Sequence, residues 1–360
     1  MRQLLALLAL TALAGQGAAA QAQWTPEVGV KSGFVRVKPA GTSAADHTDA
    51  IDLPGVGYAS VFAVIPLWRR LAIEPNVGFN QLSLGVPQLP SLFLSATNVD
   101  LGLRVDGAIT GHLFGAVGGK LFYAEAAGEH DTQFGAQAAA GYRMSLSRGL
   151  VARIEAQVVA AGRGYRHHLQ PANSYSALLG ISARVAGAAA SPVATGAWAP
   201  EIGFAAGYSR IHLSGAGVTA DVTTFASPGT AARAGLPAPP TMFVVIPVWG
   251  RLALEPGFDV HHSHANGTTS FAGTFSYRLD YAVARHWYAA AGPVVQVVKD
   301  STNSTLGVSG VAVAWGGRFA VAGDVGGRVE IAYAMFKERS GAPFATNTVA
   351  ITFAATLPLQ

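Results

Sequence analysis

The chain has 360 residues, of which 50% are hydrophobic, 12% are charged and 43 are glycine, and it contains no cysteine. The absence of cysteine excludes a disulfide scaffold, a zinc–thiolate site, an iron–sulfur centre and a cysteine nucleophile. The formal net charge of +4 is too small and too dispersed to indicate nucleic-acid binding. Charged residues are about half as frequent as in a typical soluble domain, yet after residue 23 no hydrophobic stretch is long enough for a membrane-spanning helix.

The first segment, residues 1–22, predicts a cleavable secretory signal peptide. A positive charge at Arg2 precedes the apolar run LLALLALTALAG, and the small residues of AAAQAQ permit cleavage after Ala20 or Ala22. The apolar run is shorter than the roughly 20 residues that a spanning helix needs. We therefore expect an exported protein.

Beyond the leader, the hydrophobic pattern has a period close to two, which predicts strands. In NVDLGLRVDGAI, for example, Leu101, Leu103 and Val105 fall on one face, and Arg104 and Asp106 fall on the other. The first half of the chain is expected to form eight strands, at residues 25–37, 56–67, 71–83, 96–108, 112–124, 132–146, 150–162 and 174–186. A second set of eight is expected to begin near residue 199.

The connections between these strands alternate between long and short. Long polar segments, such as Pro39–Gly55 and EAAGEHD, alternate with tight turns such as Trp68–Arg70. The second half repeats the alternation, with a very long first loop at Ser214–Pro240 and HHSHANGT as its second loop. Outer-membrane barrels have short periplasmic turns and longer extracellular loops, so this alternation favours such a barrel over a soluble sandwich.

The two halves are an internal duplication. VFAVIPLWRRLAIEPNVGF, from Val61, returns as MFVVIPVWGRLALEPGFDV, from Met242, with ten of nineteen positions identical. WTPEVGV at Trp24 likewise returns as WAPEIGF at Trp198. We predict a first β-barrel repeat at residues 23–186, a small-residue linker at 187–197, and a second β-barrel repeat at 198–360.

These observations predict an all-β fold, namely a transmembrane antiparallel up-and-down β-barrel with about eight strands per repeat. Strands can cross a bilayer only as a closed barrel, because every backbone N–H and C=O group must be paired there. Aromatic side chains near the strand ends are expected to form girdles at the two membrane interfaces. They are Trp24, Phe34, Tyr58, Phe62, Trp68, Phe79, Phe114, Phe122, Tyr142, Trp198, Trp249, Trp287 and Trp315.

The strand that ends in VIPLW, the tight basic turn and the strand RLAIEPNVGF resemble the second hairpin of the small outer-membrane β-barrel domain family, of OmpA/OmpX-like type. The resemblance covers each half nearly end to end. It implies an eight-stranded porin-family-like barrel, an outer-membrane location, and outer-membrane lipid as the surroundings of the barrel.

Oppositely charged residues stand two apart on the polar face of several strands, as in Arg104 with Asp106. That face cannot contact lipid, where an arginine at mid-depth costs roughly 2–4 kcal/mol. Because the signs nearly balance, we interpret these side chains as a structural network in the lumen more than as a selectivity filter. The predicted network comprises Glu74, Arg104, Asp106, Arg153, Glu155, Glu255, Arg278, Asp280, Arg328 and Glu330.

The sequence is compatible with two tandem eight-stranded barrels and with one sixteen-stranded barrel. Each repeat has an even number of strands, so both arrangements keep all the tight turns on the same side. The linker, the Gly/Ala-rich interior and the balanced charges favour two barrels. The economy of closing the sheet only once, around a porin-sized lumen, favours a single barrel.

No catalytic, cofactor or metal site is predicted. His261, His262 and His264 form HHSH, which we interpret as polar rim residues, since no carboxylate or cysteine completes a metal set nearby. No GxSxG or HExxH motif occurs. We expect a non-enzymatic outer-membrane barrel with a structural role, or with a surface-recognition role in which the external loops bind a surface ligand. The alternatives are a diffusion porin that passes small polar solutes and a barrel enzyme that acts on lipid.

Overall fold

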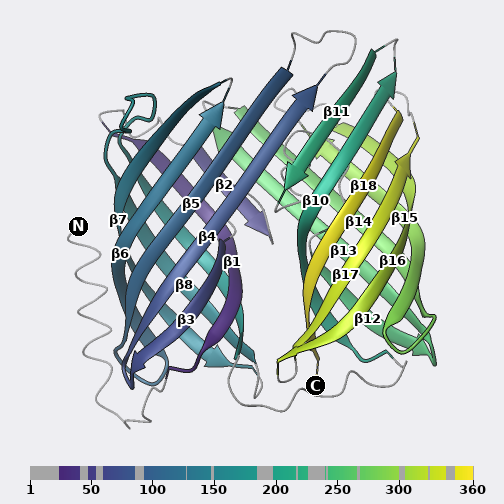
Figure 1. The fold of residues 1–360 in the computed structure, drawn as a ribbon, viewed down its shortest axis with the longest axis horizontal. Coiled ribbons are helices and arrows are strands. Elements are labelled where there is room, and N and C mark those ends of the chain that lie inside the picture. The colour runs from purple at the N-terminus through teal and green to yellow at the C-terminus, as the bar shows by residue number, and fades with distance from the viewer. Residues whose placement is uncertain are drawn as a thin grey trace.

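The computed structural model describes residues 24–40, 48–53, 60–85, 93–126, 128–146, 150–184, 198–215, 218–225, 240, 242–265, 268–299, 305–322, 325–337 and 345–359. The predicted signal peptide and the predicted linker at 187–197 lie outside these residues. The described residues form eighteen strands, arranged as two antiparallel barrels side by side (Figure 1). Within these ranges no helix is long and apolar enough to cross a membrane.

The first barrel is built from the first half of the chain. Its strands are β1 (Glu27–Pro39), β2 (Thr48–Leu53), β3 (Ser60–Trp68), β4 (Leu71–Gly85), β5 (Phe93–Ala108), β6 (Leu113–Ala126), β7 (Glu129–Ser145), β8 (Leu150–Ala161) and β9 (Ala172–Arg184). Each strand from β3 to β8 pairs with the strand that follows it in the chain. β1 closes the ring, because Glu27 lies opposite both Arg184 of β9 and Val64 of β3. The first half therefore closes as an eight-stranded barrel.

The second half repeats this arrangement. Its strands are β10 (Glu201–Gly215), β11 (Val218–Phe225), β12 (Met242–Trp249), β13 (Leu252–Ala265), β14 (Thr268–Ala282), β15 (Trp287–Lys299), β16 (Thr305–Ala322), β17 (Val325–Phe336) and β18 (Ala345–Pro358). Glu201 of β10 lies opposite Pro358 of β18 and Val245 of β12. The protein thus contains two closed eight-stranded barrels, here called barrel 1 and barrel 2. The prediction of two barrels is confirmed.

The two ends of the barrels differ in how the strands pair. The turn end carries the tight connections at residues 69–70, 109–112, 250–251 and 283–286, and the loop end is the opposite end. At the turn end, β3 lies between β1 and β4, and β12 lies between β10 and β13. At the loop end, the short strand β2 lies between β1 and β13 of the other barrel, and β11 lies between β10 and β4.

This strand exchange joins the barrels at the loop end. Residues 48–53 of β2 pair with 260–265 of β13, and 221–225 of β11 pair with 81–85 of β4. Followed around the loop end, the hydrogen-bonded order is β1, β2, β13 to β18, β10, β11, β4 to β9 and back to β1. Sixteen strand segments form this ring. Two separate barrels at the turn end therefore merge into one wider ring at the loop end (Figure 1).

The sequence prediction missed β2 and β11, which were both assigned to long loops. The predicted loops EAAGEHD and HHSHANGT are also mostly strand, because β6 and β7 extend to Ala126 and Glu129, and β13 and β14 extend to Ala265 and Thr268. A 17-residue strand such as β7 is about 56 Å long and, tilted at about 45°, rises about 40 Å. An apolar band is about 25 Å tall, so these strands continue beyond it.

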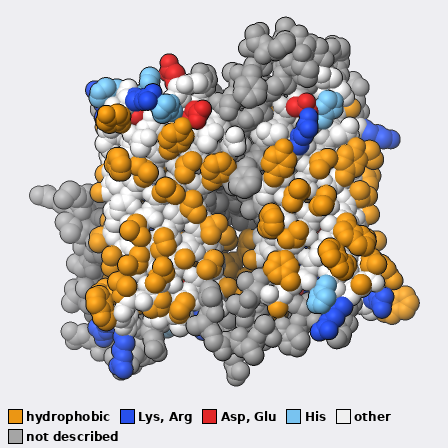
Figure 2. Space-filling view, in the orientation of Figure 1, with side chains coloured by type: hydrophobic (Ala, Val, Ile, Leu, Met, Phe, Trp, Pro, Cys, Tyr) orange, Lys and Arg blue, Asp and Glu red, His pale blue; other side chains and the backbone are white. Residues whose placement is uncertain are grey.

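The period-two pattern separates an apolar exterior from a polar interior, as predicted. On β5, Leu103 is 58% exposed, whereas its neighbours Arg104 and Asp106 are 1% and 0% exposed. On the face shown in Figure 2, hydrophobic side chains cover the middle of both barrels and the charged ones lie near the two ends. A band of this kind is what lipid requires of a barrel exterior.

The prediction of aromatic girdles agrees with the structure only in part. Trp68, Trp249, Trp287 and Trp315 are exposed on the exterior. In contrast, four aromatic residues assigned to the girdle are buried inside the barrels, and that prediction was wrong for them: they are Trp24, Phe62, Phe114 and Trp198. Alternation alone places a residue on a face, but it does not distinguish an aromatic ring that faces lipid from one that fills a lumen.

Glycines make room for these lumenal rings. A Cβ atom on Gly203 would lie 2.0 Å from the Phe243 ring, and one on Gly141 would lie 2.5 Å from the Phe114 ring. Such contacts are far shorter than van der Waals distance. Part of the high glycine content is therefore explained by a narrow interior that holds large side chains.

Candidate functional site: two lumenal charge clusters

Each barrel holds a cluster of ion-paired side chains in its turn-end half. The barrel-1 cluster consists of the acids Glu27, Glu74, Asp106 and Glu155 and the bases Lys31, Arg104, Arg143 and Arg153. The barrel-2 cluster consists of the acids Glu201, Glu255, Asp280 and Glu330 and the bases Arg278, Arg318 and Arg328. All ten residues of the predicted network lie in these two clusters.

The barrel-1 cluster centres on Arg104 and Glu74. Arg104 donates from both terminal nitrogens to Glu155, with N–O distances of 2.6 and 2.7 Å, and lies 2.9 Å from Glu74. Glu74 also binds Arg153 and accepts a hydrogen bond of 2.9 Å from the Lys31 ammonium group. Arg104 and Glu74 are 1% and 0% exposed. Bidentate, charge-assisted geometry of this kind is the strongest form that such a pair takes.

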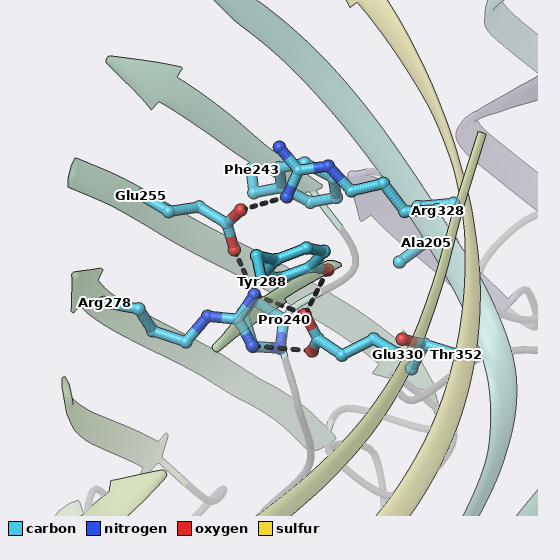
Figure 3. A pocket seen from close by; sticks show the side chains of 10 residues that line it. Ala205, Pro240, Phe243, Glu255, Arg278, Tyr288, Arg328, Glu330 and Thr352 are labelled. Carbon is cyan, nitrogen blue, oxygen red and sulfur yellow. Dashed lines mark hydrogen bonds and ion pairs between the residues drawn. The ribbon is translucent and has the colours of Figure 1, made fainter. Parts of the chain in front are cut away.

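The barrel-2 cluster has the same plan. Arg278 donates to both oxygens of Glu330 at 2.6 and 2.9 Å and also to Glu255. Arg328 lies 2.5 Å from Glu255 (Figure 3). It also lies 3.5 Å from Glu201. The duplicated sequence therefore folds into duplicated contacts.

The buried aromatic rings stack against these guanidinium groups. The Arg153 guanidinium carbon lies 4.4 Å from the centre of the Phe62 ring, and that of Arg328 lies 4.7 Å from the Phe243 ring. Near the turn end, Arg143 lies 4.1 Å from the Trp24 ring. Cation–π contacts of this kind stabilise a desolvated guanidinium that water can no longer hydrate.

The sequence prediction did not include Lys31 in the network. It lies four residues after Glu27 on the same strand, so both share the lumenal face. That spacing was the available signal. Glu27, Arg143, Glu201 and Arg318 also join the clusters outside the predicted set.

The clusters fill the lumens of the eight-stranded sections. An eight-stranded barrel has an interior just wide enough for side chains. Opening that interior would separate ion-paired side chains and leave buried charges unpaired, which is costly. The ion pairs therefore favour a closed interior. Chemically, the arrangement is suited to a plug.

The histidines of HHSH lie on β13 at the loop end. His261 is 4% exposed, and the His264 ring nitrogen Nδ1 lies 2.8 Å from the Thr269 hydroxyl. Among the residues that the structure describes, no three His, Cys, Asp or Glu side chains are grouped to hold a metal ion.

One external loop of barrel 1, residues 162–171, is held in place by a carboxylate. Asp131 at the start of β7 accepts hydrogen bonds from the backbone N–H groups of Arg166 at 2.7 Å and Leu169 at 2.8 Å. His167 has a φ of 67°, which is uncommon for a residue with a side chain. Tyr165 is 85% exposed. The loop therefore presents its side chains from a fixed backbone.

No protein-family model matches the chain, and no curated protein matches it in sequence. Similar solved structures include Ail, the attachment invasion locus protein of Yersinia pestis in complex with the heparin analogue sucrose octasulfate. Its TM-score is 0.28 at 10% identity, over 45% of this chain and 99% of that one. A FadL homologue of Pseudomonas aeruginosa has a TM-score of 0.29 at 10% identity, over 93% and 91% of the two chains. OmpT of Vibrio cholerae, with loop L8 deleted, has a TM-score of 0.26 at 10% identity, over 92% of this chain and 99% of that one. At these scores the likeness carries no inference about function.

The class of the protein follows from its own geometry. Closed antiparallel barrels, an apolar exterior and a lumen that holds charges together define a β-barrel membrane protein of the outer-membrane type. The resemblance to the OmpA/OmpX-like domain family remains a prediction.

Proposed function

We propose that this protein is a non-enzymatic outer-membrane barrel whose lumens are closed and whose role is structural or is recognition of a surface ligand at the loop end. The observation that carries the proposal is the pair of lumenal charge clusters. Near-balanced buried ion pairs in a narrow barrel stabilise a plug, whereas rings of one sign are typical of selective pores. With closed lumens, the external surface is what remains available for a partner.

The loop at residues 162–171 supports the recognition role. Arg163 and Arg166 are exposed, and neither forms an ion pair within the described part of the chain. Guanidinium groups held on a fixed backbone suit a partner that carries phosphate, sulfate or carboxylate groups, because little conformational entropy is lost on binding. The proposed ligand is therefore anionic.

Binding to an immobilised polyanion tests this role. We expect the wild-type protein in detergent micelles to be retained on dextran sulfate at low salt, and the variant Arg163→Ala/Arg166→Ala to elute at lower salt. Arg70→Ala, which removes an exposed arginine at the turn end, is the matched control and is expected to elute as wild type. Equal elution of all three proteins would contradict recognition by this loop.

A diffusion porin is the second candidate, and the ring at the loop end favours it. Neutral amide side chains are also buried in both barrels, such as Gln137 and Gln157, whose side chains are 2.7 Å apart, and Gln296. A neutral polar wall is compatible with the passage of small polar solutes. Passage through the protein would still require that at least one cluster open.

Conductance across a planar bilayer separates the two candidates. We expect the wild-type protein to show no steady channels, because both eight-stranded sections are filled. The charge-balanced variant Arg104→Ala/Glu155→Ala removes both side chains of one bidentate ion pair and serves as the open control. Small steady currents are expected from it. Steady large channels in the wild type would overturn the closed-barrel proposal in favour of the porin.

A further inference from the structure

The two clusters differ at one place, although their plans are the same. Lys31 of barrel 1 lies four residues after Glu27, and the residue four after Glu201 in barrel 2 is Ala205. In barrel 1 the Lys31 ammonium group lies 2.9 Å from Glu74 and 3.6 Å from Glu155. Barrel 2 has the matching carboxylates, Glu255 and Glu330, without the ammonium group.

This difference leaves the barrel-2 cluster with a surplus negative charge. Among the described residues, the barrel-1 cluster joins four acids to four bases, and the barrel-2 cluster joins four acids to three bases. An uncompensated charge in a desolvated site is unfavourable unless a counter-charge or a proton is supplied.

A cavity lies in barrel 2 where the ammonium group is missing. Ala205, Tyr288, Thr352 and the ion-paired side chains Glu255, Glu330, Arg278 and Arg328 are among the residues that line it (Figure 3), and its volume is about 30 Å³. Lys31 of barrel 1 lies among the same pairs, because Arg104 and Arg153 bind Glu74 and Arg104 also binds Glu155. A single water needs about 10–15 Å³. The cavity therefore has room for a small ion and about one water, but not for a larger organic ligand.

Two further substitutions between the repeats add oxygen atoms to this cavity. Tyr288 stands where barrel 1 has Phe114, and both follow the central arginine by ten residues. Thr352 stands where barrel 1 has Leu178, since the two lie opposite Gly207 and Gly33 at matching positions. The Tyr288 hydroxyl donates to Glu330 at 2.8 Å.

We propose that the barrel-2 cavity binds a small monovalent cation, in the place that the Lys31 ammonium group occupies in barrel 1. Carboxylate and hydroxyl oxygens are the ligands that hard cations prefer. One positive charge balances the surplus, whereas a divalent ion would reverse it. The cation then completes the plug of barrel 2, as the lysine completes that of barrel 1.

The unfolding midpoint of the full-length protein in detergent micelles tests this proposal. At equal chloride concentration, we expect the wild type to unfold at least about 2 °C higher in sodium, potassium or ammonium chloride than in N-methyl-D-glucamine chloride, whose cation is too large for the cavity. In Ala205→Lys the ammonium group is supplied by the chain, so the dependence on the cation is expected to disappear. Thr352→Leu removes a ligand oxygen and is expected to weaken the dependence.

A second measurement does not depend on the folding of a variant. Crystals of the wild type grown with thallium(I) are expected to show an anomalous peak between Glu255 and Glu330, and none at Lys31. A map without that peak, or an unfolding midpoint that is the same in all four salts, overturns the proposal. The latter result would mean that a proton balances the surplus charge.

Discussion

A variant with cysteines in place of Ser83 and Thr223 is expected to form an intramolecular disulfide between the two halves of the chain. The two residues lie opposite each other where β4 of barrel 1 pairs with β11 of barrel 2. Opposed residues in an antiparallel pair have Cα atoms about 4.5–5.5 Å apart, which is compatible with a disulfide. The natural chain contains no cysteine, so no other thiol competes. Non-reducing electrophoresis and mass spectrometry of the linked peptides measure the result.

The second exchange contact gives an independent pair, Ala50→Cys with Ser263→Cys, across β2 and β13. Ser83→Cys with Ser95→Cys, across β4 and β5 of barrel 1, is the matched control and is expected to link in either arrangement. If the control links and both exchange pairs stay reduced, each barrel closes on itself along its whole length. Proteolytic cleavage in the linker adds a further readout, because exchanged strands are expected to hold the two halves together in mild detergent.

Replacement of Arg104 by methionine is expected to destabilise barrel 1 by about 3–5 kcal/mol. The change removes the partner of Glu155 and a neighbour of Glu74 and Asp106, so that buried carboxylates lose their counter-charge. Arg278→Met is expected to do the same in barrel 2. Denaturant unfolding in micelles, with the heat-dependent shift in gel migration of the folded form, measures the loss.

Two controls separate a charge effect from a loss of packing. Arg36→Met removes an exposed arginine that pairs with Asp49, and near-wild-type stability is expected. The double variant Arg104→Met/Glu155→Gln removes one base and one acid and is expected to be less unstable than the sum of the two single variants. Additive losses would show that the ion pair contributes nothing beyond the volume of its side chains.

The sequence showed which face of a strand a residue occupies, but it did not show which side chains contact one another. Leu103 and Arg104 could be assigned to opposite faces because lipid and lumen are different surroundings, and the period of two records which one each residue meets. The internal duplication allowed Arg278 and Glu330 to be predicted as the counterparts of Arg104 and Glu155. Trp24 and Phe62 were misplaced, because an aromatic ring satisfies both a membrane interface and a cation–π contact.

The sequence by itself determined a membrane barrel, its internal duplication and the polarity of its interior. Only the tertiary structure decided which strands pair at the loop end, because backbone hydrogen bonds between strands are the same whichever strand supplies them. Eight-stranded and sixteen-stranded closures therefore share one pattern of side chains. The exchange of β2 and β11 combines both closures in one molecule, with two filled barrels at the turn end and a single ring at the loop end.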